Sequence, residues 1–174
     1  VFDELCANFF VLSENRKRIR KQKPAKRFFK KNSNYIENKL PFTLTASQQD
    51  VLSEINEDLL GKKRMFRIIQ GDVGSGKTIV SLLAISNVIE SGYQCALMAP
   101  TEILAKQHYE LSKKIFKDMN FKIDFLTGKT EYKYRKEIHE NLDNGKTNLL
   151  IGTHSLFQKK INFRKLGLVI IDEQ

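Results

Sequence analysis

The residues with the clearest chemistry lie between positions 71 and 78, where the sequence reads GDVGSGKT. This G-x-x-x-x-G-K-T pattern is typical of a loop that binds the phosphates of a nucleoside triphosphate. Glycines let the backbone approach phosphate oxygens, and the unpaired amides of the helix that follows favour an anion. Lys77 would place its charge at the β- and γ-phosphates, and the Thr78 hydroxyl would bind Mg²⁺. The predicted nucleotide contacts of this loop are Gly71, Val73, Gly74, Ser75, Gly76, Lys77 and Thr78.

A second candidate site lies about a hundred residues further on. An apolar run at 168–171 predicts a buried strand, and two carboxylates, Asp172 and Glu173, follow it directly. Asp172 would hold Mg²⁺ through water, and Glu173 would act as general base on the attacking water. The alternative is an ordinary strand followed by a polar turn. The preceding phosphate-binding loop favours the catalytic interpretation, with Lys77, Asp172 and Glu173 as the catalytic residues.

The elements that must position these residues alternate between short apolar runs and longer amphipathic segments. The sequence predicts strands at 65–70, 94–98, 122–126, 147–151 and 166–171, helices at about 77–91, 102–118 and 131–142, and a short helical turn with Leu156 and Phe157. This alternation predicts an α/β fold, a P-loop NTPase lobe whose parallel sheet is covered by helices on both faces. Each candidate motif follows a predicted strand directly, and ligands bind at the carboxyl ends of such strands.

An earlier helix is predicted ahead of the phosphate-binding loop. Thr45 has the character of an N-cap, and Gln48, three residues on, completes a capping box. Gly61 would end this helix. Its apolar face consists of Val51, Leu52, Ile55 and Leu59. Residues 32–41 are polar and are predicted to form a loop.

The first 35 residues differ in character from the rest of the chain, so we divide it into a connector with a basic linker, 1–35, and a lobe, 36–174. Apolar residues at helical spacing over 1–15 predict an amphipathic helix that continues toward Pro24. Residues 16–31 hold ten of the thirty Lys and Arg and no acidic residue. This run is either a solvated linker or a patch that contacts nucleic-acid phosphates. The candidate contacts there are Arg16, Lys17, Arg18, Arg20 and Lys21.

The overall composition bounds the class of protein. An apolar share of 41% and a charged share of 29% are those of a globular protein, and no run of 18 apolar residues predicts a membrane span. Cys6 and Cys95 lie in apolar surroundings without metal-ligand spacing, which favours buried thiols in a reducing compartment and a cytoplasmic location. The chain begins with valine and stops within a motif, so we expect a fragment of a longer protein.

The ordered motifs GDVGSGKT, APTEILAKQH, LTG, GTHSLFQ and VIIDEQ resemble the first motor lobe of superfamily 2 helicases. Within that superfamily, residues 40–174 resemble the RecG family of bacterial ATP-dependent DNA helicases, which remodel stalled replication forks. The resemblance implies a RecA-like lobe, ATP and Mg²⁺ as cofactors, and forked or branched DNA as the partner. We further expect a monomer that has no membrane partner. Gln48 would read the adenine edge, a role compatible with its place in a capping box.

The resemblance also implies a DNA-facing set of residues in the loops at the strand ends. Read alone, Thr101 could equally be an N-cap, Gly128 a turn glycine and His154 a structural histidine. The implied contacts are Pro100, Thr101, Thr127, Gly128, Thr153 and His154. The family also has a wedge domain and a second motor lobe with an arginine finger, both absent from this sequence. We therefore expect the chain alone to bind Mg-ATP weakly and to hydrolyse it negligibly.

Other functions remain open at this stage. The nearest is a transcription-repair coupling translocase, whose first lobe shares much of this motif set. An RNA helicase is disfavoured because Gln174 follows the acidic pair. A P-loop kinase would transfer phosphate to a small acceptor, and a simple nucleic-acid-binding module would use only the basic run. The kinase generally lacks the threonine loops, and the binding module has no need of Lys77 or Glu173.

Overall fold

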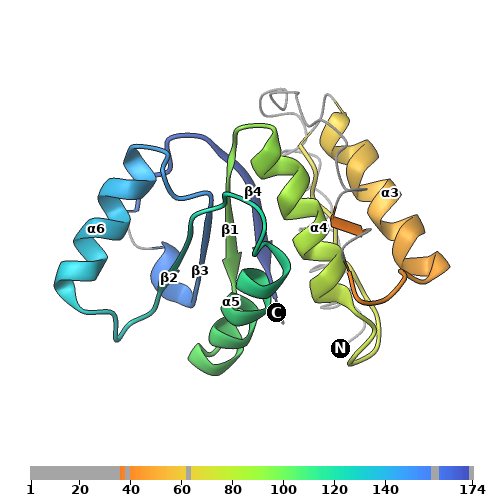
Figure 1. The fold of residues 1–174 in the computed structure, drawn as a ribbon, viewed down its shortest axis with the longest axis horizontal. Helices are drawn as coiled ribbons and strands as arrows, with labels where there is room; N and C mark the ends of the chain where they lie inside the picture. Colours follow the sequence, from red (N-terminus) through yellow and green to blue (C-terminus); the bar gives the residue numbers. More distant parts are fainter. Residues whose placement is uncertain (1–35, 38–39, 62–63, 158–160, 173–174) are drawn as a thin grey trace, which may run out of the picture.

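The computed structural model describes residues 36–37, 40–61, 64–157 and 161–172 (Figure 1). The predicted connector helix, the basic run with its five candidate contacts, and Glu173 lie outside these residues. In the part of the chain described, no helix is long and apolar enough to cross a membrane.

The centre of the fold is a four-stranded parallel sheet with strand order β2-β3-β1-β4, which confirms the predicted parallel architecture. In register, Met98 lies between Gly152 and Ile171, and Gly152 pairs in turn with Leu126. All four strands therefore end at the same edge of the sheet, and the residues that follow them meet there. The strands are β1 (Gln94–Met98), β2 (Ile123–Leu126), β3 (Leu149–Gly152) and β4 (Leu166–Ile171).

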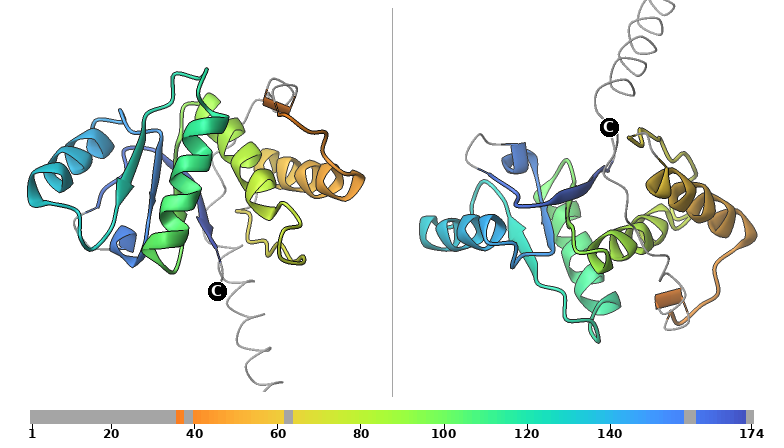
Figure 2. Two further views of the ribbon diagram at one scale, coloured as in Figure 1. Left: turned by 60° about the horizontal axis from the view of Figure 1, so that its bottom comes forward. Right: turned by 90° about the horizontal axis from the view of Figure 1, so that it is seen from above.

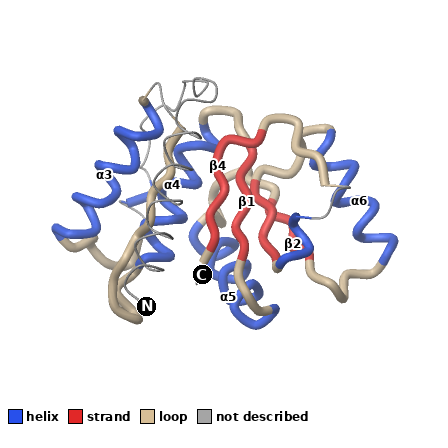
Figure 3. Tube along the Cα trace, turned by 180° about the vertical axis from the view of Figure 1, so that it is seen from behind, coloured by secondary structure: helices blue, strands red, loops and turns tan. Residues whose placement is uncertain are grey.

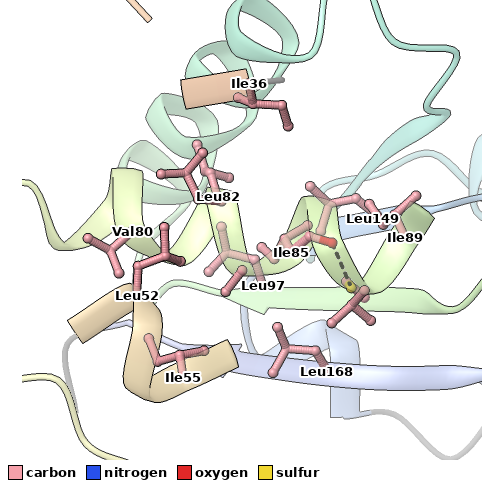
Figure 4. Close-up of a cluster of buried hydrophobic side chains, with 14 of the residues drawn as sticks. Ile36, Leu52, Ile55, Val80, Leu82, Ile85, Ile89, Leu97, Leu149 and Leu168 are labelled. Carbon is pink, nitrogen blue, oxygen red and sulfur yellow. Dashed lines mark hydrogen bonds between the residues drawn. The ribbon is translucent and has the colours of Figure 1, made fainter. Parts of the chain in front are cut away.

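Two helices, α4 (Lys77–Glu90) and α5 (Glu102–Ile115), cover one face of the sheet (Figure 2). A third helix, α3 (Ala46–Leu60), packs on the outer side of α4. The interface between α3, α4 and the sheet is the larger core, in which Leu82, Ile85, Leu97 and Leu149 are almost fully buried (Figure 4). Cys95 belongs to this core as a free thiol that donates to the Ile85 carbonyl oxygen at 3.8 Å. The prediction that Cys95 is a buried thiol is confirmed.

The opposite face carries a smaller core beneath α6 (Tyr132–Asp143) and the 3₁₀ turn η1 (His154–Phe157). These elements cover β2 and β3, so the prediction of helical cover on both faces holds on this half of the sheet. Over β4 no helix of the described residues covers this face (Figure 3), and Val169 and Ile171 keep 44% and 40% of their surface exposed.

The predicted strand at 65–70 is wrong, because these residues form no strand. Met65 and Ile69 pack against the larger core, whereas Phe66 and Ile68 are exposed, so the side chains alternate as they would in a strand. A strand also needs a neighbour for its backbone hydrogen bonds, and the sheet described here ends at β4. Arg67 instead attaches the segment to α3 through Asp58 and Glu54.

Two smaller expectations also need correction. Residues 32–41 were predicted to form a polar loop, but residues 36–37 are helical and Ile36 is 2% exposed within the larger core (Figure 4). Helix α5 ends at Ile115, three residues before the predicted end at 118. The chain turns there because Phe116, 3% exposed, inserts into the core and stacks edge-on against Phe121.

Candidate functional site

The loop at 71–78 is curled tightly onto the first turn of α4. Gly74 and Gly76 both have φ of 82°, a left-handed conformation that side chains with a Cβ rarely adopt. Gly76 is the N-cap of α4 and makes no side-chain cap. The Ile79 amide donates to the Gly76 carbonyl oxygen at 3.0 Å, so the Lys77 and Thr78 amides are the ones that remain for an outside acceptor. At Gly71 a Cβ would lie 2.9 Å from the Ser75 hydroxyl oxygen. The predicted glycine geometry and helix N-terminus are therefore both present.

The Lys77 ammonium lies inside the curve of this loop. It donates to the main-chain oxygens of Gly71 at 2.7 Å and Asp72 at 2.8 Å. A bound phosphate would compete with these neutral carbonyl groups and offer a stronger, charge-assisted partner. The Val73 side chain is fully exposed at the loop tip, so we expect Val73 to contact a nucleotide through its main-chain atoms.

Gln48 connects the start of α3 to the phosphate-binding loop. Its Oε1 accepts from the Thr45 amide at 2.9 Å, and its own amide donates to the Thr45 hydroxyl at 3.3 Å, which confirms the predicted capping box. Its Nε2 donates to the Ser75 carbonyl oxygen at 2.9 Å. The side chain lies so close that a Cβ on Gly76 would be 2.4 Å from Nε2. Reading of an adenine edge by Gln48 stays a prediction. The two bonds use one Nε2 hydrogen and one Oε1 lone pair, so a second hydrogen and a second lone pair remain for the base.

Asp172 is held at the strand-end edge by two different elements. Its amide donates to the Met98 carbonyl oxygen at 2.8 Å, which ties it to the end of β1. Its Oδ2 lies 2.6 Å from Nε2 of His108 in the middle of α5. The Asp172 side chain is 27% exposed and that of His108 only 9%. Sequence reasoning missed His108, although it shares the buried face of α5 with Ala105 and Ser112 at positions i−3 and i+4.

These residues suit Mg²⁺ brought by a nucleotide better than a metal held by the protein alone. Among the residues described, no group of three or more His, Cys, Asp or Glu could hold a metal ion. Mg²⁺ usually keeps several waters and is bound through one or two carboxylates plus substrate phosphates. The Thr78 hydroxyl on the first turn of α4 and the partly exposed Asp172 carboxylate fit that pattern of donors.

The loops after β1 and β2 are joined to each other at the same edge. Thr101 caps α5 by accepting from the Leu104 amide at 3.3 Å, so the N-cap alternative is correct for its side chain. Glu102 pairs with Lys129 at 3.0 Å, and this hydrogen bond lowers the pKa of the Glu102 carboxyl. The Thr127 hydroxyl accepts from the Lys129 amide at 3.3 Å. The hydroxyl groups of the predicted DNA contacts Thr101 and Thr127 therefore each accept a hydrogen bond from a main-chain amide, which leaves the O–H of each hydroxyl as a separate donor.

The remaining predicted contacts differ in exposure. Gly128 and His154 are exposed, whereas Pro100 and Thr153 are half-buried. Arg135 of α6 donates to the Thr127 carbonyl oxygen at 2.9 Å, which places a further cation beside this loop. The register of the sheet brings all six predicted residues to the edge that also carries Asp172.

The family model and the similar proteins all identify this chain with helicases. The model of the DEAD/DEAH box helicase family matches residues 45–174. The ATP-dependent DNA helicase RecG of Synechocystis sp. is 45% identical over 180 residues, which is 100% of this chain and 21% of that protein. RecG of Aquifex aeolicus is 43% identical over 179 residues, covering 100% of this chain and 22% of that protein. The chain thus spans about a fifth of the length of the curated relatives it matches.

Solved structures agree with this assignment. A structure of RecG bound to a three-way DNA junction matches 92% of this chain and 22% of that chain, with a TM-score of 0.86 and 41% identity. A hypothetical ATP-dependent RNA helicase from Sulfolobus tokodaii matches 81% of this chain and 40% of that chain, with a TM-score of 0.61 and 21% identity, which shows the fold alone. By sequence and by fold, the chain belongs to the DEAD/DEAH box helicase family.

Proposed function

We propose that this chain is the nucleotide-binding motor lobe of an ATP-dependent DNA helicase that remodels forked or branched DNA. The observation that carries the proposal is the likeness to RecG bound to a three-way DNA junction, with a TM-score of 0.86 at 41% identity. The likeness to an RNA helicase, at 21% identity, concerns the fold alone. A DNA substrate is therefore favoured over RNA.

In this proposal the loop at 71–78 holds the triphosphate. The first-turn amides of α4 and the Lys77 ammonium bind the β- and γ-phosphates, and Gln48 binds the base. Thr78 and Asp172 bind the Mg²⁺ that accompanies ATP, and Glu173 orients and deprotonates the attacking water. Mg²⁺ neutralises the charge that develops on the phosphates. Support comes from the left-handed conformation of Gly74 and Gly76, the position of Lys77 and the partly exposed carboxylate of Asp172.

The strand-end loops form the DNA side of the lobe. Main-chain amides, the Thr101 hydroxyl and the cations Lys129 and Arg135 are the groups that contact the DNA backbone. Thr101 accepts a bond from the Leu104 amide and keeps its O–H to donate to a phosphate oxygen. Such contacts position DNA without reading its sequence, as suits an enzyme that recognises branch structure. Pro100, Gly128, Thr153 and His154, which belong to the same edge, complete this surface.

Residues 1–35 would act as a connector whose basic run, 16–31, adds phosphate contacts through Arg16, Lys17, Arg18, Arg20 and Lys21. Residues 36–174 would be the first motor lobe. ATP binding and release would then open and close this lobe against a second one in a monomer, with a wedge domain at the fork. The greater length of the relatives supports this organisation, since the chain covers 21–22% of the first two.

The test is an unwinding assay on branched DNA with the longest natural polypeptide that contains this sequence. We expect ATP-dependent unwinding of a three-way junction, which Lys77→Ala abolishes. Lys117→Ala, an exposed lysine just beyond the far end of α5, is the matched control and should leave unwinding intact. Phosphate transfer to a small acceptor without any effect of DNA would instead support a kinase. Unwinding of RNA but not of DNA would contradict the proposed substrate.

A further inference from the structure

The contact between His108 and Asp172 has no role in the function proposed so far. His108 Nε2 lies 2.6 Å from Asp172 Oδ2, a short distance for a bond between a ring nitrogen and a carboxylate oxygen. The two residues are 64 positions apart and belong to different elements, α5 and the end of β4. A partly exposed carboxylate in a strand-end loop would otherwise be free to rotate. Here one of its oxygens is already committed.

His108 is itself held rigidly. Its side chain is 9% exposed, and the small residues Ala105 and Ser112 on the same face are fully buried, so α5 lies close to the sheet at this point. The helix is fixed at its start by the Thr101 cap and by the ion pair of Glu102 with Lys129. His108 therefore presents Nε2 from a fixed position.

The backbone of Asp172 is fixed from the other side. Its amide donates to the Met98 carbonyl oxygen at 2.8 Å, at the point where β1 ends. With the main chain tied to β1 and Oδ2 tied to α5, the direction of the carboxylate is determined before any ligand binds. Oδ1 is then the oxygen left for a metal ion or its waters. Preorganisation of this kind strengthens a metal ligand, because binding no longer has to immobilise it.

We propose that His108 is a positioning residue, which orients Asp172 to receive the Mg²⁺ of a bound nucleotide. The inference rests on the proposed nucleotide site and deepens it. His108 touches neither nucleotide nor metal in this account and acts only through Asp172. Loss of the Nε2 donor should therefore weaken the response of nucleotide binding to Mg²⁺, while binding without Mg²⁺ is unchanged.

Two amide substitutions separate this role from a merely structural one. In His108→Gln the side-chain nitrogen can reach the position of Nε2, whereas in His108→Asn the side chain is one carbon shorter and falls short of Asp172. Both variants place an uncharged, polar amide at the same buried position. A purely structural requirement for a polar group would affect them alike. A requirement for a donor at Oδ2 would affect only the Asn variant.

The experiment measures the affinity of the full chain for a fluorescent ATP analogue, in EDTA and across a Mg²⁺ titration, with urea denaturation of each unliganded variant alongside. We expect His108→Asn to need about tenfold more Mg²⁺ than wild type for half-maximal enhancement of binding, the low end of what loss of an orienting partner costs. His108→Gln should stay close to wild type. All three proteins should bind the analogue equally in EDTA.

The outcomes separate the two proposals. An equal Mg²⁺ requirement in wild type and His108→Asn would overturn the positioning role and leave the nucleotide site intact. An equal rise in the Mg²⁺ requirement of His108→Asn and His108→Gln would also overturn the positioning role, because the effect would then not depend on whether the side-chain nitrogen reaches Asp172. If wild type itself bound no analogue, the proposed nucleotide site would fail, and the positioning role with it. Should His108→Asn fail to fold, the Mg²⁺ requirement of His108→Gln decides, and a tenfold rise there refutes the role.

Discussion

A buried pair of asparagines joins the two helices that flank the phosphate-binding loop. Asn87 of α4 donates its Nδ2 to Oδ1 of Asn56 on α3 at 2.8 Å. The two residues are 1% and 8% exposed. Within the described part of the chain, Oδ1 of Asn87 has no hydrogen-bond partner. The pair holds α3, and with it Gln48, in register with α4, but it already carries one unsatisfied acceptor.

Replacing Asn56 by Ala removes the partner of a fully buried donor. Neither Nδ2 nor Oδ1 of Asn87 then has a hydrogen-bond partner among the described residues. A newly unsatisfied buried group costs about 1–3 kcal/mol. A second substitution, Asn87→Ala, removes that amide altogether. We therefore expect the double variant Asn56→Ala/Asn87→Ala to be little less stable than Asn56→Ala alone. The free-energy changes of the two single variants should sum to more than that of the double variant, by about 1 kcal/mol or more.

Equilibrium urea denaturation of the four proteins measures this difference. The midpoint should shift while the slope with denaturant stays constant, which shows that only stability has changed. Asn144→Ala at the exposed end of α6 is the control and should fall within about 0.5 kcal/mol of wild type. If the single effects add to the double effect within about 0.3–0.5 kcal/mol, the two side chains are not coupled and the reasoning is refuted.

Three further predictions concern the elements at the strand-end edge and the α3 cap. Gly152→Ala would place a Cβ 1.9 Å from a main-chain oxygen of β2, so we expect a loss of about 1–3 kcal/mol or more in urea denaturation, whereas Gly128→Ala, with nothing within 4 Å, should lose far less. Thr45→Ala removes the α3 N-cap and should lower the free energy of unfolding by about 0.5–2 kcal/mol. Thr45→Ser keeps a hydroxyl at the cap and should lose much less stability. Hydrogen bonding to Lys129 lowers the pKa of Glu102, so their pair stabilises the fold above the unfolded pKa and loses this effect as pH falls through the folded pKa. Glu102→Gln should accordingly make stability less dependent on pH over that acid range, and an unchanged pH profile would show that the pair does not contribute.

Much of the site could be predicted because its signals are local. The loop at 71–78, the Thr45 and Gln48 capping box and the bounds of β1 and β4 follow from short patterns of residue type and spacing. The carboxyl ends of parallel strands lie at one edge of a sheet, so predicting the strands also predicts which loops meet. The register of β1 with β3 and β4 aligns Met98, Gly152 and Ile171 at this edge. Local chemistry identifies the phosphate loop, and sheet topology places Asp172 and the threonine loops at one edge.

The features that were missed depend on tertiary partners. The pattern of residues 65–70 is that of a strand, but a ladder needs a neighbouring strand, and Arg67 joins the segment to α3 instead. Ile36 lies in a polar stretch and is buried because it reaches the larger core. His108 could be placed on a helix, but its contact with a carboxylate 64 residues away follows only from the fold. These contacts between distant residues have no local sequence signature.

The most direct test of the account is calorimetric titration of the full chain with ATP in the presence of Mg²⁺. Wild type should bind ATP at a single site, and Lys77→Ala should weaken binding about tenfold or more, because a charge-assisted bond contributes about 1.5–3 kcal/mol and 1.4 kcal/mol is a factor of ten. The control Lys117→Ala should bind as wild type does. ATP binding by Lys77→Ala that equals wild type, or no binding by wild type, would contradict the central claim that the loop at 71–78 is a nucleotide site.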